Sequence, residues 1–301
     1  MKAEEIKKVL IIGAGTMGRQ IGFACAMAGV EVMMYDIVEK VLESAAKGVE
    51  ELAQTFVKAG RLTPGQADRA RDRIHYVTDA KEAGKEADFV SESIPEDPAL
   101  KGRVFKQFNE ICPERAIFTT NTSTLIPSMF AKETGRPDRF AAFHFHDIRF
   151  TRIVDIMPHP GTSRNTLSTI EDFAKRIGQV PIILEKENFG YVFNAMLMEL
   201  LKSALTLAAN QVTSIENIDR AWMGVMNTPS GPFGLMDSIG IDTVWKITDY
   251  WANVLKDPQS LANAAFLKTY VDRGELGVKT GKGFYSYPDP AFSQPAFVYG
   301  E

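Results

Sequence analysis

The chain is poor in several features that would assign a protein to a special class. Its 301 residues include only two cysteines, Cys25 and Cys112, so a disulfide-stapled secreted fold is excluded and a reduced, cytoplasmic setting is expected. The net charge is −4, which leaves no basic surface typical of nucleic-acid binding. The first residues lack the apolar core of a signal peptide, and the apolar stretch 189–209 contains both acidic and basic residues. We therefore expect neither a nucleic-acid partner nor a membrane span.

The most informative segment is a glycine-rich turn between an apolar stretch and a helical one. Residues 9–12 are aliphatic and predict a buried parallel strand. Gly13, Gly15 and Gly18 then form G-x-G-x-x-G, and a helix is predicted over 16–28. The first glycine allows a tight turn, the second lets backbone approach a pyrophosphate, and the third lets the helix pack closely. Such glycines also occur in ordinary turns, but the flanking strand and helix favour a dinucleotide site.

The acid that ends the next strand completes this pattern. Residues 31–35 predict a strand that ends at Asp36, where a carboxylate can bind the adenosine ribose hydroxyls and repel a 2′-phosphate. The amides that open the helix would face the phosphates. We therefore predict NAD as the cofactor. The residues assigned to it from this segment are Gly13, Gly15, Thr16, Met17, Gly18 and Asp36.

The rest of the chain divides into an alternating part and a helical part. Further strands are predicted at 74–77, 87–91, 116–119, 140–145, 153–157 and 180–184, with helices between most of them. This alternation indicates an α/β fold with a Rossmann-type doubly wound sheet. Near residue 187 the pattern becomes wholly helical. We therefore predict a cofactor domain over 1–187, an all-helical domain over 188–288 and a tail over 289–301.

Eight motifs resemble one family, the L-3-hydroxyacyl-CoA dehydrogenases, which include 3-hydroxybutyryl-CoA dehydrogenase. In chain order they are IIGAGTMG, ESIPE, TTNTSTL, RFAAFHF, VDIMPHP, GYVFNAML, SGPFGLMDSIGIDT and GVKTGKGFYSY, and they extend over nearly the whole sequence. The resemblance implies NAD-dependent oxidation of a short-chain L-3-hydroxyacyl-CoA to the 3-ketoacyl-CoA. It also implies that the helical domain forms a homodimer and that an acyl-CoA substrate binds in a cleft between the domains.

A histidine in the RFAAFHF motif is the candidate base. Oxidising a secondary alcohol requires a group that takes the hydroxyl proton, and histidine is well tuned to this near neutral pH. His144 matches the family's catalytic histidine, and Asp155 stands where the family has a glutamate that orients the ring. Asp155 is one methylene shorter, and the connection to it is also one residue shorter. The alternatives are a hydrogen-bonded core histidine and an aspartate without that role.

The residues after the histidine depart from the family pattern. Asp147 replaces a neutral amide that would help to hold the substrate's carbonyl region, and an anion there should change which acyl groups are accepted. His144, His146 and Asp147 could together suggest a metal site. Zinc usually requires three well-separated protein ligands with a second layer of support, so we predict no metal and treat His146 as a loop residue.

The resemblance assigns further residues to substrate and cofactor. Ser123 would lie near the nicotinamide and the substrate hydroxyl, and Asn194 would point at the acyl carbonyl. The segment 121–123 could instead cap a helix that starts near residue 124. Charged residues are also often simply solvated. The further cofactor-binding residues are Glu96, Lys101, Asn121 and Lys279.

The carrier of the acyl group is the point at which alternatives stay open. Leu52 and Ala59 occupy positions where the family has polar contacts to CoA, and the neighbouring Lys58 is turned about 100° away on the helix. One alternative is therefore oxidation of a free 3-hydroxy acid or polar alcohol, as in the related gulonate dehydrogenase and lambda-crystallin. Another is an NAD-binding relative without catalysis.

Overall fold

The computed structural model describes residues 1–299, which fall into two compact units. The first runs from Met1 to Phe193, and the second begins at Asn194. The domain limits predicted after residues 187 and 288 stay predictions. Within the described residues, none of the helices has both the length and the apolarity that a membrane span requires.

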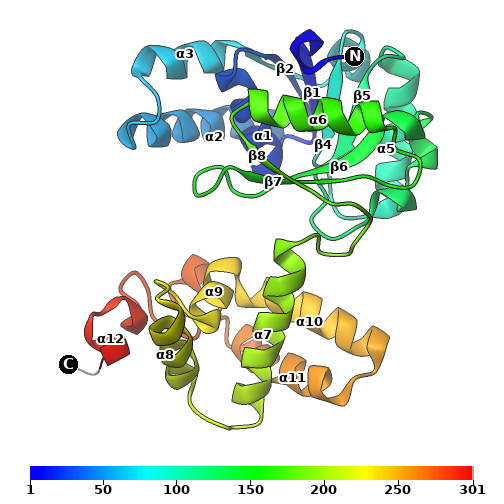
Figure 1. Ribbon diagram of the computed structural model, residues 1–301. Helices are drawn as coiled ribbons and strands as arrows, with labels where there is room; N and C mark the ends of the chain where they lie inside the picture. The colour runs from blue at the N-terminus through cyan, green and yellow to red at the C-terminus, as the bar shows by residue number, and fades with distance from the viewer. Residues whose placement is uncertain (300–301) are drawn as a thin grey trace. The chain divides into compact units, whose positions relative to one another are not determined.

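The first unit contains one sheet of eight strands in the order β3-β2-β1-β4-β5-β6-β7-β8 (Figure 1). All neighbours pair in parallel except β6 and β7, which are antiparallel. This is the predicted doubly wound sheet, and it includes the two strands predicted after β6, which are β7 and β8. The strands are β1 (Lys8–Ile12), β2 (Glu31–Tyr35), β3 (Ile74–Val77), β4 (Phe89–Glu92), β5 (Ile117–Thr120), β6 (Phe140–Phe145), β7 (Ile153–Met157) and β8 (Val180–Ile183).

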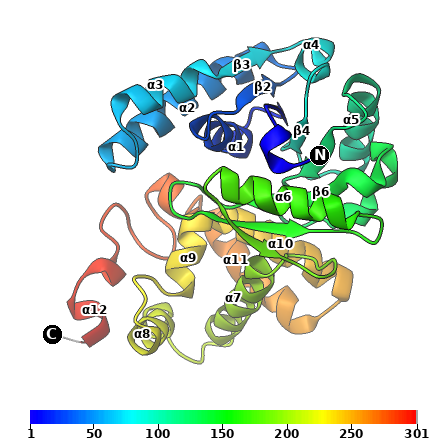
Figure 2. The same ribbon diagram turned by 45° about the horizontal axis from the view of Figure 1, so that its top comes forward.

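Helices cover both faces of this sheet, as Figure 2 shows. In β1, Val9 and Ile11 pack into the core beneath α1, α2, α3 and α6, whereas Leu10 and Ile12 pack with α4 and α5. Burial on both faces explains why these strands are continuously aliphatic. The helices are α1 (Thr16–Met27), α2 (Glu39–Lys58), α3 (Pro64–Asp72), α4 (Ala80–Gly84), α5 (Pro98–Ile111) and α6 (Arg164–Arg176).

The second unit is helical, with its own apolar core. Helix α10 packs along α11, and α8 packs with α9 and α12. The helices are α7 (Phe193–Ala209), α8 (Ile215–Met226), α9 (Pro232–Ile239), α10 (Ile241–Leu255), α11 (Pro258–Asp272) and α12 (Ala296–Tyr299). Helix α9 begins within NTPSGPFG, a segment whose prolines and glycines are typical of a connection between helices. It has proline at its first position, and Asp219 accepts hydrogen bonds from the Phe233 and Gly234 amides.

Candidate active site

The glycine turn has the shape that a dinucleotide requires. Gly13 has φ +95, and a Cβ there would lie 2.7 Å from the Ser93 carbonyl oxygen. At Gly18 a Cβ would lie 1.9 Å from the Gly13 carbonyl oxygen, so any larger residue would push α1 away from the turn. A Cβ at Gly15 would meet nothing within 4 Å. The turn is therefore closely packed on the protein side and open where a phosphate could approach.

The end of β2 lies beside this turn. The Asp36 carboxylate accepts a hydrogen bond from the Ala14 amide at 3.1 Å and another from the Val38 amide at 3.1 Å. Gly15 is the N-cap of α1, so the first amides of that helix, from Thr16 onward, have no partners within the helix. Amides for phosphate and a carboxylate for ribose hydroxyls thus lie at adjacent strand ends. These residues fit NAD.

The candidate base lies further along the same edge of the sheet, at the end of β6. His144 and Asp155 are directly opposite each other in the antiparallel pair of β6 and β7. The His144 Nδ1 atom is 3.0 Å from Asp155 Oδ2, and both side chains are buried. The antiparallel turn-back after β6 is what brings the acid to the histidine, because cross-strand neighbours have their Cβ atoms about 5 Å apart.

This hydrogen bond determines which ring nitrogen can accept a proton. An ionised carboxylate only accepts hydrogen bonds, so Nδ1 carries the hydrogen and Nε2 keeps its lone pair. Burial alone would raise the pKa of Asp155, but hydrogen bonds from His144 and His146 outweigh it and hold the pKa below its usual range. The pair is therefore arranged as a base with an anionic partner that would stabilise the protonated ring.

Two aromatic neighbours of His144 had no assigned role in the sequence. Tyr191 packs against the His144 ring with centroids 4.8 Å apart, and its hydroxyl donates to the Thr122 carbonyl oxygen at 2.7 Å. Burial holds the pKa of Tyr191 well above its usual value. His146, expected to be only a loop residue, places Nε2 3.1 Å from the same Asp155 oxygen. The sequence signal for this turn was the glycine of GYVFNAML, because glycine favours positive φ. In the structure both Gly190 and Tyr191 adopt positive φ.

Of the two charged residues predicted to lie near the cofactor after β4, Lys101 is buried and Glu96 is exposed, and the two form an ion pair. Lys101 Nζ is 2.6 Å from Glu92 Oε1 and 3.3 Å from Glu96 Oε2. Glu92 also accepts hydrogen bonds from the Ile94 amide and the Thr120 hydroxyl, both at 2.7 Å. Burial is the larger influence on Glu92, and it raises the pKa even though Lys101 acts in the opposite direction. The described contacts of Lys101 are thus internal ones.

The polar segment after β5 holds the neighbouring strand ends together. Asn121 accepts a hydrogen bond from the Phe145 amide at 2.8 Å, which fastens the end of β6 beside His144. Glu96 accepts hydrogen bonds from the Thr122 hydroxyl and the Ser123 amide, both at 2.8 Å. The alternative of a helix cap is wrong, because no α-helix begins near residue 124 and the next helical turn is the short 3₁₀ segment Pro127–Met129.

Asp147 lies in the loop between β6 and β7, and its charge is paired. Its two carboxylate oxygens lie 2.9 and 3.0 Å from Arg149 Nε. Burial acts to raise the pKa of Asp147, but hydrogen bonds from Arg149 outweigh it and lower the pKa.

The possible metal ligands considered in the sequence were His144, His146 and Asp147, but the structure groups the two histidines with Asp155 and not with Asp147. The possible ligand atoms of His144, His146 and Asp155 lie within 4.8 Å of one another.

The remaining predicted residues lie elsewhere. Asn194 is on α7, and Lys279 forms an ion pair with Asp242, both within the second unit. Leu52 is buried in the core beneath α2, and Ala59 ends that helix on the surface. Neither of the last two positions supplies a polar group for a carrier.

Comparisons with known proteins identify the family of the chain. The family model of the 3-hydroxyacyl-CoA dehydrogenase NAD binding domain matches residues 8–188, and the model of the C-terminal domain matches residues 190–287. The human mitochondrial hydroxyacyl-coenzyme A dehydrogenase is 33% identical over 288 residues, covering 94% of this chain and 91% of the human protein.

Two solved structures are similar over nearly the whole chain. One, described as a diketoreductase with substrate-directed dual catalysis of dicarbonyl compounds, has a TM-score of 0.87 and 37% identity, with 94% and 99% of the two chains covered. The other is (S)-3-hydroxybutyryl-CoA dehydrogenase from Ralstonia eutropha, with a TM-score of 0.85, 31% identity and coverage of 95% and 100%. The chain belongs to the 3-hydroxyacyl-CoA dehydrogenase family and is an NAD-dependent oxidoreductase.

Proposed function

We propose that the protein oxidises a short-chain L-3-hydroxyacyl-CoA, such as 3-hydroxybutyryl-CoA, to the 3-ketoacyl-CoA, with His144 as the general base. The observation that carries the proposal is the buried hydrogen bond of 3.0 Å between His144 and Asp155, at the same sheet edge as the glycine turn. It leaves one imidazole nitrogen ready to accept a proton. It also supplies an anion that stabilises the resulting charge.

In this reaction the cofactor would accept a hydride from the alcohol, and the protein accepts its proton. Bound NAD supplies the acceptor for the hydride that leaves substrate C3. His144 Nε2 takes the hydroxyl proton as the carbonyl forms, so the alcohol loses two electrons and two hydrogens in all. Asp155 keeps the ring oriented and compensates the imidazolium charge. In the reverse direction the imidazolium returns the proton to the carbonyl oxygen.

The other site residues are proposed on the sequence resemblance and the contacts above. Ser123 and Asn194 would bind substrate, and Asp147 would shape the acyl site as a charge neutralised by Arg149. We propose a cytoplasmic location, which suits the two free, buried thiols. The residues proposed for the cofactor are Gly13, Gly15, Thr16, Met17, Gly18, Asp36, Glu96, Lys101, Asn121 and Lys279.

A second candidate is reduction of a dicarbonyl compound or oxidation of a free 3-hydroxy acid. The similarity to the diketoreductase structure, at 37% identity, favours it, as does the absence of a polar side chain at Leu52 and Ala59. The chemistry is closely related, because a 3-ketoacyl thioester also has two carbonyl groups. The same base and hydride acceptor would serve both substrates, and only the carrier would differ.

The substrate assay separates these candidates. With NAD and (S)-3-hydroxybutyryl-CoA, absorbance should show NADH formation with kcat/KM at least about 100-fold above that for free (S)-3-hydroxybutyrate, because contacts to the carrier add binding energy. Equal or better turnover of the free acid would contradict the thioester proposal. Faster NADH oxidation with a dicarbonyl ester than with acetoacetyl-CoA would favour the second candidate. NAD binding without turnover of any substrate would favour the non-catalytic alternative.

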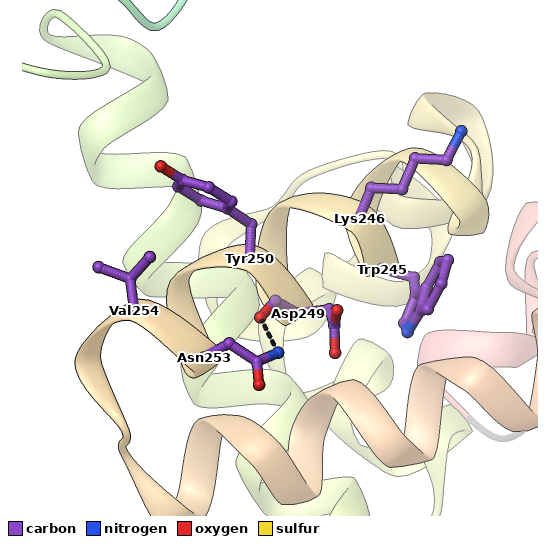
Figure 3. Close-up of a pocket in the computed structure, with 6 residues that line it drawn as sticks. All are labelled: Trp245, Lys246, Asp249, Tyr250, Asn253 and Val254. Carbon is purple, nitrogen blue, oxygen red and sulfur yellow. Dashed lines mark hydrogen bonds between the residues drawn. The ribbon is translucent and has the colours of Figure 1, made fainter.

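We propose that the protein is a homodimer formed by its helical unit. Helix α10 exposes Tyr250, Trp251, Val254 and Leu255, each more than 40% accessible, and Met196 on α7 is also exposed. Figure 3 shows Tyr250 and Val254 projecting from α10 beside a cavity of about 450 Å³. Exposed apolar groups gathered on one helix are typical of a surface that another protein covers.

Sedimentation tests this proposal. At micromolar concentration the protein should sediment with twice the chain mass. Val254→Asp should raise the dissociation constant by about 100-fold or more, because burying an unpaired charge costs about 3–5 kcal/mol. Val225→Asp, on the exposed surface of α8, is the matched control and should leave the dimer intact. A wild-type protein that sediments as a monomer would refute the dimer, and a dimeric Val254→Asp variant would refute this surface.

A further inference from the structure

Two imidazoles share one carboxylate oxygen in this site. Asp155 Oδ2 lies 3.0 Å from His144 Nδ1 and 3.1 Å from His146 Nε2. The two histidine rings meet edge to face with centroids 4.7 Å apart, and the Phe193 ring lies edge-on to His146 at 5.5 Å. His146 follows directly after β6, where residues two apart on extended backbone point to the same side.

The hydrogen bond from His146 restricts the Asp155 side chain, which the hydrogen bond from His144 alone would leave free to rotate. The terminal torsion of aspartate has a broad, roughly two-fold preference, so a single contact with His144 permits a range of carboxylate orientations. A second N–H donor at Oδ2 narrows that range. The residues of adjoining elements that contact the two histidines are Asp155 on β7 and, after β8, Tyr191 and Phe193. In the described contacts, the side chains that donate to the Asp155 carboxylate are those of His144 and His146.

We propose that His146 is a positioning residue for the dehydrogenase reaction: it donates its Nε2–H to Asp155 and so fixes the carboxylate that orients His144. The inference rests on the proposed role of His144 as the base. It also accounts for how a short aspartate on β7 holds an imidazole across the strand pair. Asp155 Oδ2 accepts a hydrogen bond from each of the two rings. Both rings come from the end of β6, because the two histidines are two residues apart in HFH.

Two substitutions separate hydrogen bonding from mere packing. His146→Phe keeps a ring against Phe193 but removes the donor, whereas His146→Gln keeps an amide N–H that can reach Asp155. We expect His146→Phe to lower kcat by about 10- to 100-fold through misorientation of the base, with KM for substrate and for NAD changed less than about twofold. His146→Gln should retain at least about a third of the wild-type kcat. Thermal unfolding should show that both variants are folded.

A spectroscopic measurement tests the same inference without turnover. In the NAD complex, the imidazole N–H proton of His144 that is bound to Asp155 should give a downfield NMR resonance, identified by its loss in His144→Gln. It should persist in His146→Gln and be shifted or lost in His146→Phe. If the wild type proves inactive on every substrate, this resonance still decides the positioning role, so failure of the proposed function is a separate result.

Three results would overturn the inference. The first is an unchanged kcat and His144 resonance in His146→Phe. The second is equal loss of activity in folded His146→Gln and His146→Phe, which would mean that the imidazole itself is required. The third is stoichiometric zinc in the purified wild type that both variants lose. That result would make His144, His146 and Asp155 metal ligands instead.

Discussion

His144→Gln should lower kcat for hydroxyacyl oxidation by about 10²–10⁴-fold, the contribution typical of a positioned general base. Glutamine has a similar reach and its amide can still donate to Asp155, so the buried carboxylate keeps a partner. It has no basic nitrogen at the position of Nε2, and the hydroxyl proton would then have no acceptor. Stopped-flow and steady-state measurements of NADH absorbance would give the loss directly.

The affinity of His144→Gln for NAD shows whether the loss of kcat comes from proton transfer or from weaker cofactor binding. Because His144 is assigned to proton transfer, the NAD dissociation constant of His144→Gln should remain within about twofold of the wild-type value, measured by fluorescence titration. His159→Gln is the matched control, since His159 is also buried but donates to the Pro137 carbonyl oxygen at 2.9 Å, away from Asp155. It should retain normal kcat. Substantial turnover in His144→Gln would remove His144 from the role of base.

Much of the fold followed from the sequence because its local signals agree with one another. The aliphatic residues 9–12, the three glycines and Asp36 each require the same strand, turn, helix and strand, and the structure contains them at those positions. The helical unit was expected from its periodicity. Helix α9 was missed because proline and glycine next to it indicate a connection, whereas the buried Asp219 carboxylate binds its first amides from 14 residues away.

The site followed less completely, because its decisive contacts join residues on different strands and helices. The resemblance paired His144 with Asp155, but whether an aspartate can reach the ring depends on the register of β6 and β7, which only the structure supplies. The same register brings His146 to Asp155. For Lys101, the motif suggested a cofactor contact, and nothing in the local sequence revealed that Glu92 lies beneath it in the sheet. Burial of an ion pair depends on the whole fold.

Lys101→Met should therefore cost about 3–5 kcal/mol of folding stability, because it leaves the buried Glu92 carboxylate without its cation. Methionine fills a similar volume, so the loss is electrostatic and not a cavity effect. Urea denaturation followed by circular dichroism would measure it. Glu92→Gln combined with Lys101→Met should recover most of the loss, since the glutamine amide keeps polar atoms for the Ile94 amide and the Thr120 hydroxyl. The exposed Lys175→Met is the control and should change little.

The pH dependence of this loss has a definite sign. Burial raises the pKa of Glu92 above its usual value, and removing Lys101 takes away an influence that lowers it. An acid whose pKa is higher in the folded protein is relieved of its burial penalty as pH falls toward that pKa, because the neutral form is the one that the interior accepts. The deficit of Lys101→Met should thus be larger at pH 8 than at pH 5. Unchanged stability of Lys101→Met at both pH values would contradict this role of the buried ion pair, whereas weakened NAD binding would support the cofactor role also proposed for Lys101.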